Sequence, residues 1–265
     1  MVHLSSIIAM GVAALLGIAV PFLLAWWLAR KYKANVATMA IGAAVFIVFA
    51  LGLESVVHQI VLKGPSGAGI LGNTWLYALY GASMAALFEE TGRFLAMKFL
   101  LRKEPSGALP GVSYGLGHGG IEMFMLFGLG MVSNMVIAIM MNAGQGDLLF
   151  ANVPPEAMEQ VQAQLAGIES ITAGSVLVGL WERISALILQ LGLSLIMWTA
   201  VRRGGKWLWL IACAFLLHFL VDGVIVVLAK SVSMVAVELV CFSIAIAVGA
   251  VGWKLGRSLE AEKAR

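Results

Sequence analysis

Residues 4–29 read LSSIIAMGVAALLGIAVPFLLAWWLA, and this stretch decides the fold because it contains no charged side chain. A helix needs about 20 predominantly apolar residues to cross the hydrocarbon core of a bilayer, so the run is long enough to span one. It is too long for the apolar core of a signal peptide and lacks a basic leader, since its positive cluster, Arg30, Lys31 and Lys33, follows it. We therefore expect a retained transmembrane helix.

The rest of the chain has the same character. Of its 265 residues, 61% are hydrophobic and 12% are charged, whereas about a quarter of a soluble domain is charged. Apolar runs separated by polar connectors predict about seven spans, at residues 4–29, 36–62, 74–101, 111–141, 171–200, 206–229 and 232–255. We expect an all-α integral membrane protein of the cell membrane, with the bacterial inner membrane favoured, built as a single membrane domain over residues 1–265.

The basic residues of the connectors indicate the orientation of this bundle. Most of them lie in alternate connectors, which carry Arg30, Lys31 and Lys33, Arg102 and Lys103, Arg202, Arg203 and Lys206, and Lys254 and Arg257. Cytoplasmic connectors are enriched in Lys and Arg, so the N-terminus is expected outside and the C-terminus in the cytoplasm. The net charge of +3 is spread over these connectors rather than gathered in a patch, which argues against a nucleic-acid partner.

One connector, residues 142–170, is long and carries no Lys or Arg. Within it Met158, Val161, Leu165 and Ile168 recur at helical spacing and form one apolar stripe. We expect a short amphipathic helix there, lying on the outer membrane surface or over the bundle.

Ionisable residues inside the spans are the strongest functional signal, because charge is costly in hydrocarbon and is usually kept for function. The spans contain Glu54, His58, Glu89, Glu90, Arg93, His118, Glu122, Glu182, Arg183, His218, Asp222 and Glu238. On four spans such residues are four apart and therefore share a helix face, in the pairs Glu54/His58, Glu89/Arg93, His118/Glu122 and His218/Asp222.

The depths of the last three of these pairs are compatible with one shared site. At about 1.5 Å rise per residue, Glu89 lies about 22 Å from the outer end of its span. His118 and His218 lie about 10 Å and about 18 Å from the cytoplasmic ends of theirs by the same rise. These groups are expected to meet in one layer at or below the midplane, whereas Glu54 and His58 fall near the outer face, away from it.

At these residues the chain resembles the glutamate-type intramembrane peptidases. That group joins the CAAX prenyl protease and bacteriocin-processing family, the PrsW family and the YhfC-like membrane peptidases. The motifs of the first family, on successive core helices, are matched by Glu89-Glu90 with Arg93, by Tyr114 with His118, and by His218 with Asp222. Arg93 is one residue closer than that pattern has it, Tyr114 replaces Phe, and Asp222 stands in the Asn position. The stretch Gly-His118-Gly-Gly-Ile-Glu122 makes the YhfC-like branch the nearest.

The resemblance implies a peptidase-like core over residues 74–229 and an intramembrane endopeptidase acting on a membrane-associated peptide or protein. It implies Glu89 as the base that activates water, Glu90 as the alternate base, and His118 as the group that positions the water. His218 and Asp222 would stabilise the oxyanion, with supporting roles for Arg93, Tyr114 and Glu122. Metal-free chemistry is favoured, and the alternative is a zinc ion held by His118, Glu122, His218 and Asp222.

Other readings of the same residues stay open. A proton-coupled transporter would use buried acids and histidines as a proton relay. A haem or metal-binding membrane protein would use histidines from different helices as ligands. Glu90 and Arg93 also suit a structural ion pair, Glu182 with Arg183 a structural pair or a gate, and the glycines beside His118 plain helix packing.

Overall fold

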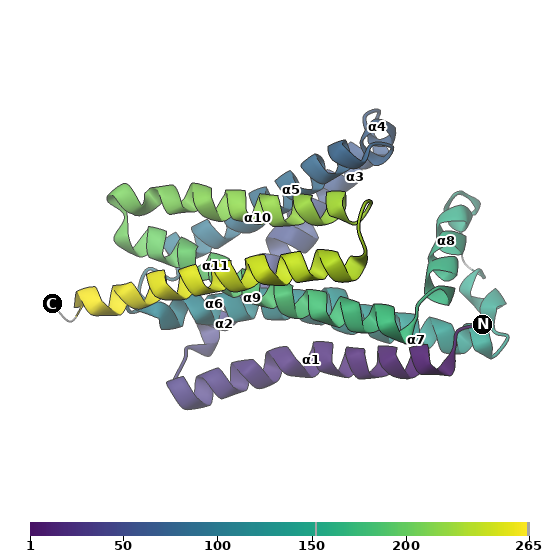
Figure 1. Cartoon of the computed structure of the whole chain (residues 1–265), viewed down its shortest axis with the longest axis horizontal. Coiled ribbons are helices and arrows are strands. Elements are labelled where there is room, and N and C mark those ends of the chain that lie inside the picture. Colours follow the sequence, from purple (N-terminus) through teal and green to yellow (C-terminus); the bar gives the residue numbers. More distant parts are fainter. Residues whose placement is uncertain (152, 264–265) are drawn as a thin grey trace. The chain divides into compact units, whose positions relative to one another are not determined.

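The computed structural model describes residues 1–151 and 153–263, and every regular element in that part of the chain is a helix (Figure 1). The backbone contacts divide the chain into two compact units. Unit 1 comprises Met1–Val20 and Met123–Arg183, and unit 2 comprises Pro21–Glu122 and Ile184–Arg265.

Six helical stretches of the described chain are long and apolar enough to cross a membrane. They are α1 (Leu4–Tyr32); Val36–Lys63, made of α2 (Val36–Phe46), the π-helical η1 (Ile47–Glu54) and α3 (Ser55–Lys63); Ala108–Asn142, made of α6 (Ala108–Glu122), the π-helical η3 (Met123–Gly128) and α7 (Leu129–Asn142); α9 (Ala173–Arg203); Gly205–Leu228, which contains α10 (Trp209–Leu228); and Met234–Glu260, within α11 (Met234–Lys263). The expectation of an all-helical, multi-pass membrane protein is confirmed.

The predicted span at residues 74–101 differs from the other six. It folds as α5 (Thr74–Leu95), which continues into the π-helical η2 (Ala96–Leu100) after a short helix α4 (Gly67–Leu71). Its charged residues Glu89, Glu90, Arg93 and Lys98 lower its hydropathy, and it is not among the six apolar stretches found in the described chain. The described chain therefore has six such stretches, whereas seven were predicted, and the difference is this helix with its charged residues.

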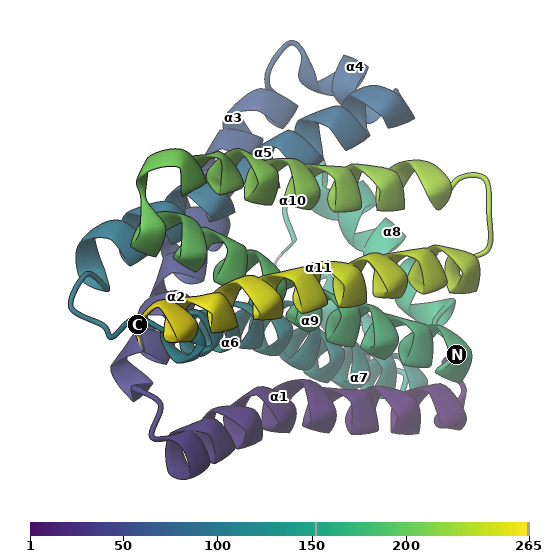
Figure 2. The ribbon, with the colours of Figure 1, turned by 60° about the vertical axis from the view of Figure 1, so that its left-hand side comes forward.

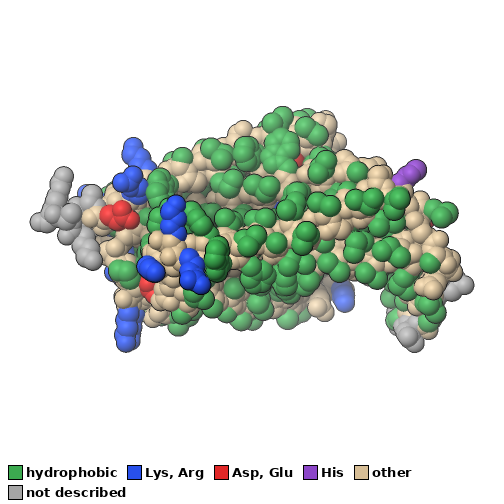
Figure 3. Space-filling model, turned by 90° about the horizontal axis from the view of Figure 1, so that it is seen from below, with side chains coloured by type: hydrophobic (Ala, Val, Ile, Leu, Met, Phe, Trp, Pro, Cys, Tyr) green, Lys and Arg blue, Asp and Glu red, His purple; other side chains and the backbone are tan. Residues whose placement is uncertain are grey.

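The surface of the molecule fits a bilayer environment. On the face drawn in Figure 3, hydrophobic side chains cover most of the area. Many large apolar side chains are well exposed, among them Leu15, Trp26, Ile60 and Trp75. In a membrane protein such side chains face lipid rather than water.

Unit 2 is organised by two close helix pairs, α2 with α6 and α5 with α10 (Figure 2). The backbones of α2 and α6 nearly touch, since a Cβ added to Gly117 would lie 1.9 Å from the carbonyl oxygen of Met39. On the neighbouring face of α6, a Cβ added to Gly119 would lie 2.9 Å from the Cβ of Gln190 on α9. Small residues thus let α6 sit tightly between α2 and α9, which holds the helix that carries His118.

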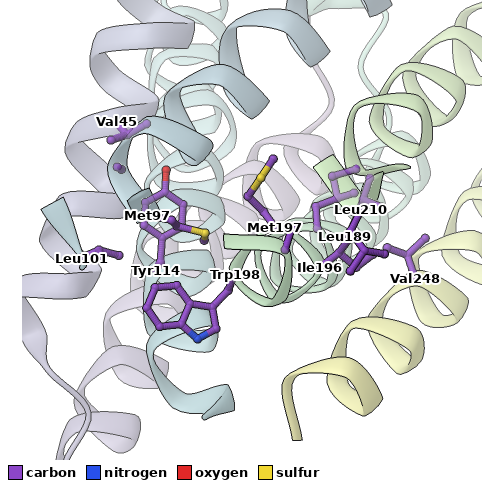
Figure 4. Close-up of a cluster of buried hydrophobic side chains, with 14 of the residues drawn as sticks. Val45, Met97, Leu101, Tyr114, Leu189, Ile196, Met197, Trp198, Leu210 and Val248 are labelled. Atoms are coloured by element: carbon purple, nitrogen blue, oxygen red, sulfur yellow. The ribbon is translucent and has the colours of Figure 1, made fainter. Parts of the chain in front are cut away.

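A cluster of large side chains fills the core of unit 2 (Figure 4). Tyr114, Met97 and Trp198 are completely buried in it and come from α6, η2 and α9. The indole Nε1 of Trp198 donates a hydrogen bond of 2.8 Å to the carbonyl oxygen of Gly107, which fixes the start of α6 against α9. This packing makes the polar residues on the same helices parts of a rigid framework.

Unit 1 contains the short helix α8 (Met158–Glu169), which lies in the connector where the sequence predicts one. Apolar residues from α1, α7, α8 and α9 form a second core, including Met10, Ala138, Ile168 and Val176. The chain start is tied to this unit, because Val2 N donates 2.8 Å to Asn142 Oδ1 and Asn142 Nδ2 donates 2.7 Å to Val2 O. In the same unit the Glu182 and Arg183 side chains form an ion pair with each other.

Candidate active site

Three helices of unit 2 bring a carboxylate and two imidazoles together. His118 Nε2 on α6 lies 2.9 Å from Glu89 Oε2 on α5, and His218 Nε2 on α10 lies 4.0 Å from the same oxygen. The exposed fractions of Glu89, His118 and His218 are only 7%, 0% and 3%. A carboxylate accepts and does not donate when ionised, so His118 donates through its Nε2–H to Glu89. The result is a buried centre at which two imidazole nitrogens face one carboxylate oxygen.

A second carboxylate orients the His218 ring. Glu90 Oε1 accepts a hydrogen bond of 2.9 Å from His218 Nδ1 and lies 3.2 Å from Arg93 Nη1. Because Nδ1 is taken by Glu90, the Nε2 of His218 is turned toward Glu89 and toward Asp222 Oδ2, which lies 3.5 Å away. A carboxylate that is hydrogen-bonded to one ring nitrogen fixes the orientation of an imidazole and thus the direction of its other nitrogen. Glu90 therefore orients His218 as well as neutralising the buried Arg93.

An amide that the sequence analysis overlooked joins this cluster from α9. Gln190 Nε2 donates 2.9 Å to Glu89 Oε2 and 3.0 Å to Glu122 Oε2. The Oε1 of the same amide accepts from Arg93 Nη2. The signal in the sequence was a single amide within an otherwise apolar run, which costs free energy unless it is hydrogen-bonded.

Aromatic rings hold the His118 imidazole. Tyr114, one turn earlier on α6, stacks on it with ring centroids 5.9 Å apart and an interplanar angle of 25°. Phe46 of α2 meets the same imidazole edge-on at 5.2 Å. These contacts leave His118 little rotational freedom, so its Nε2 stays directed at Glu89.

Glu54 and His58 form a hydrogen-bonded pair with each other and with Tyr80. His58 Nε2 lies 3.0 Å from Glu54 Oε1, and His58 Nδ1 lies 2.9 Å from the Tyr80 hydroxyl on α5. Glu54 is buried, and the segment η1 that ends at it packs against α5. The expectation that Glu54 and His58 stand apart from the cluster, near the outer face, stays a prediction.

The cluster has the donor chemistry of a zinc site. Within residues 1–151 and 153–263, no group of three or more His, Cys, Asp and Glu side chains is already arranged to hold a metal ion. The side chains present are nevertheless of the right type, since zinc in proteins prefers imidazole nitrogen and carboxylate oxygen. Histidines that bind zinc through one ring nitrogen commonly donate a hydrogen bond from the other nitrogen to a carboxylate. His218 has such a carboxylate, because its Nδ1 donates to Glu90. One of the four ligands expected from the sequence, Glu122, is hydrogen-bonded to Gln190. The carboxylate that contacts His118 is instead Glu89, which was not among the expected ligands.

The fold and the site together define a multi-pass membrane protein with a buried carboxylate–imidazole centre. The chain belongs to the YhfC intramembrane metalloprotease family, whose model matches residues 16–241. It is 34% identical over 204 residues, 76% of this chain and 78% of the relative, to the uncharacterized membrane protein YhfC of Bacillus subtilis (strain 168). No solved structure matches the chain.

This membership confirms the resemblance to the YhfC-like peptidases. The matched residues 16–241 include every side chain of the cluster. The more distant relation to the prenyl protease and PrsW families stays a prediction, because neither match concerns them. The family description also names a metalloprotease, which favours a metal over the metal-free chemistry expected from the sequence, and the identity of that metal stays a prediction.

Proposed function

We propose that the protein is an intramembrane endopeptidase that hydrolyses a peptide bond of a membrane-associated substrate at the Glu89, His118 and His218 centre. The observation that carries this proposal is the meeting of a buried carboxylate with two imidazole nitrogens from three different helices. Such groups exchange protons with a reacting water and its products, which is general acid–base catalysis. The metalloprotease description of the family supports peptide hydrolysis as the reaction.

The chemistry assigned to each residue follows from its hydrogen bonds. Glu89 takes a proton from water as the water oxygen bonds to the scissile carbonyl carbon, and the carbonyl oxygen becomes an oxyanion. His118 holds the Glu89 carboxylate through its Nε2–H, and a protonated His218 Nε2 donates to the oxyanion. The proton on Glu89 then passes to the leaving nitrogen as the carbon–nitrogen bond breaks. Asp222 stabilises the positive charge of His218 from 3.5 Å.

The same cluster contains side chains that could bind a metal ion. His118, His218 and Asp222 would hold a zinc ion, in which case the metal would replace the hydrogen bond from His118 to Glu89 and leave Glu89 as the base. Bound zinc supplies a Lewis acid that acidifies the attacking water and polarises the carbonyl. Glu90 and Arg93 keep the same positioning role in either case, because their contacts are to His218 and Gln190.

The proposed function is tested by looking for cleaved proteins. The wild-type chain and its Glu89→Gln variant would be produced in the same bacterial host, and the new N-termini of membrane proteins compared by mass spectrometry. We expect cleavage sites in or beside apolar segments that occur only with the wild type. The matched control is Glu238→Gln, the same change at a buried glutamate of α11, which should give the wild-type set of sites. Identical N-termini in all three samples would contradict peptidase activity.

A further inference from the structure

Gln190 occupies the centre of a hydrogen-bond network that links three helices. It lies on α9, is 4% exposed, and has both ends of its amide engaged. Its carbonyl oxygen accepts from Arg93 on α5, and its Nε2 donates to Glu89 on α5 and to Glu122 on α6. A primary amide has two N–H groups, so the two carboxylates use both of them.

The orientation of this amide is fixed by the chemistry of its neighbours. Arg93 is completely buried, and a guanidinium only donates. Ionised carboxylates only accept, so Glu89 and Glu122 require the NH2 end. The reverse orientation would set the amide NH2 against the guanidinium and its oxygen against two carboxylates, losing all three bonds. Buried polar groups left unbonded in this way cost about 1–3 kcal/mol each.

This fixed amide in turn fixes Glu89. Glu89 Oε2 accepts from both His118 Nε2 and Gln190 Nε2, each at 2.9 Å, and two donors from different helices define where that oxygen lies. The backbone supports the arrangement, because Gly119 brings α6 up to the Cβ of Gln190.

We propose that Gln190 is a positioning residue of the site: it holds Glu89 Oε2 against His118 and transmits the orientation set by Arg93 across α5, α6 and α9. This inference rests on the proposed peptidase function. Gln190 acts through Glu89 and does not contact the reacting peptide. Its loss should therefore slow the chemical step and leave substrate binding largely unchanged.

The test uses the full-length protein in liposomes and a quenched fluorescent peptide that contains the bond found by the N-terminal comparison. In Gln190→Met, which keeps the side-chain length and removes all three hydrogen bonds, we expect kcat to fall about 10- to 100-fold, the scale for a misplaced catalytic group. KM should stay within about twofold. The matched control is Ser194→Ala, a buried polar residue one turn further along α9, which should retain the parental kcat.

A second variant separates positioning from folding. Gln190→Glu keeps an acceptor for Arg93 but replaces the donors to Glu89 and Glu122 by a carboxylate, and it should lose kcat at least as strongly as Gln190→Met. Thermal unfolding midpoints in detergent identify any variant whose loss reflects unfolding. Groups acting as one unit are non-additive, so Glu89→Gln combined with Gln190→Met should be little slower than Glu89→Gln alone.

Two results would overturn the inference while leaving the proposed function intact. One is a folded Gln190→Met or Gln190→Glu protein with the parental kcat when Glu89→Gln is inactive. The other is a raised KM at unchanged kcat, which would make Gln190 a substrate-binding residue. A wild-type protein that produces no cleavage in the N-terminal comparison refutes the peptidase itself, and the positioning role with it.

Discussion

Replacing Glu89 by Gln tests the centre of the site with the least disturbance of its structure. The two side chains have nearly the same shape, and the environment dictates how the new amide lies. His118 and Gln190 both donate to the Oε2 position, so the amide oxygen takes that place and keeps both 2.9 Å bonds. The NH2 group then occupies the Oε1 position. The fold should therefore survive, while the proton acceptor is lost.

The expected loss of rate follows from the role of a general base. Such a group contributes about 10²–10⁴ in rate, so kcat should fall by at least about 100-fold. That factor corresponds to about 2.7 kcal/mol of transition-state stabilisation, since each tenfold change is about 1.36 kcal/mol. His118→Ala and His218→Ala should show comparable losses, because His118 holds the base Glu89 in place and His218 stabilises the oxyanion.

The assay is cleavage of the quenched peptide in liposomes, with the unfolding midpoint of each variant measured in detergent. Glu238→Gln serves as the control for replacing a buried glutamate. A Glu89→Gln protein that unfolds at the parental temperature and cleaves at the parental rate would refute the mechanism. A low unfolding midpoint would instead refute the hydrogen-bond argument that the amide keeps both donors.

Four further predictions concern the metal, the packing, the ion pair and the orientation. Because the family is described as metalloproteases and the donor set suits zinc, elemental analysis of purified protein should find about one zinc per chain. The His118→Ala/His218→Ala double variant should lose this zinc. A metal-free protein that still cleaves would instead favour metal-free chemistry. Gly117→Ala should lower stability by about 2 kcal/mol or more, because its Cβ would meet the Met39 carbonyl at 1.9 Å, whereas Gly81→Ala, with nothing within 4 Å, should unfold like the wild type. Arg93→Met should cost about 3 kcal/mol, since it breaks a buried ion pair, and an unchanged denaturation midpoint would show that the pair is not needed. Cysteine placed at position 150 should react with an impermeant reagent from outside and cysteine at position 103 should not, and the reverse labelling would overturn the orientation taken from the basic connectors.

The membrane fold could be predicted from the sequence because long apolar runs leave few alternatives. The helix at residues 74–101 was also expected, although its charges remove it from the six apolar stretches. The spacing of charged residues on three helices, and their depth, predicted that Glu89, His118 and His218 meet. The structure brings these three side chains together. Their roles in catalysis stay predictions.

Gln190 could not be predicted from the sequence for a physical reason. An uncharged amide in an apolar run carries no charge signal, and its importance is apparent only once its partners Arg93, Glu89 and Glu122 are known.

The charges of α5 have a consequence for how the chain is built into the membrane. Each unpaired charged residue at the centre of an inserting helix costs about 2.5–3.5 kcal/mol, and although Glu90 and Arg93 pair within α5, Glu89 has no partner on that helix. The groups that compensate them, His118, His218 and Gln190, are all synthesised later. Stable insertion of α5 should therefore wait for α6, α9 and α10, and the site would be assembled in the same step that commits this helix to the bilayer.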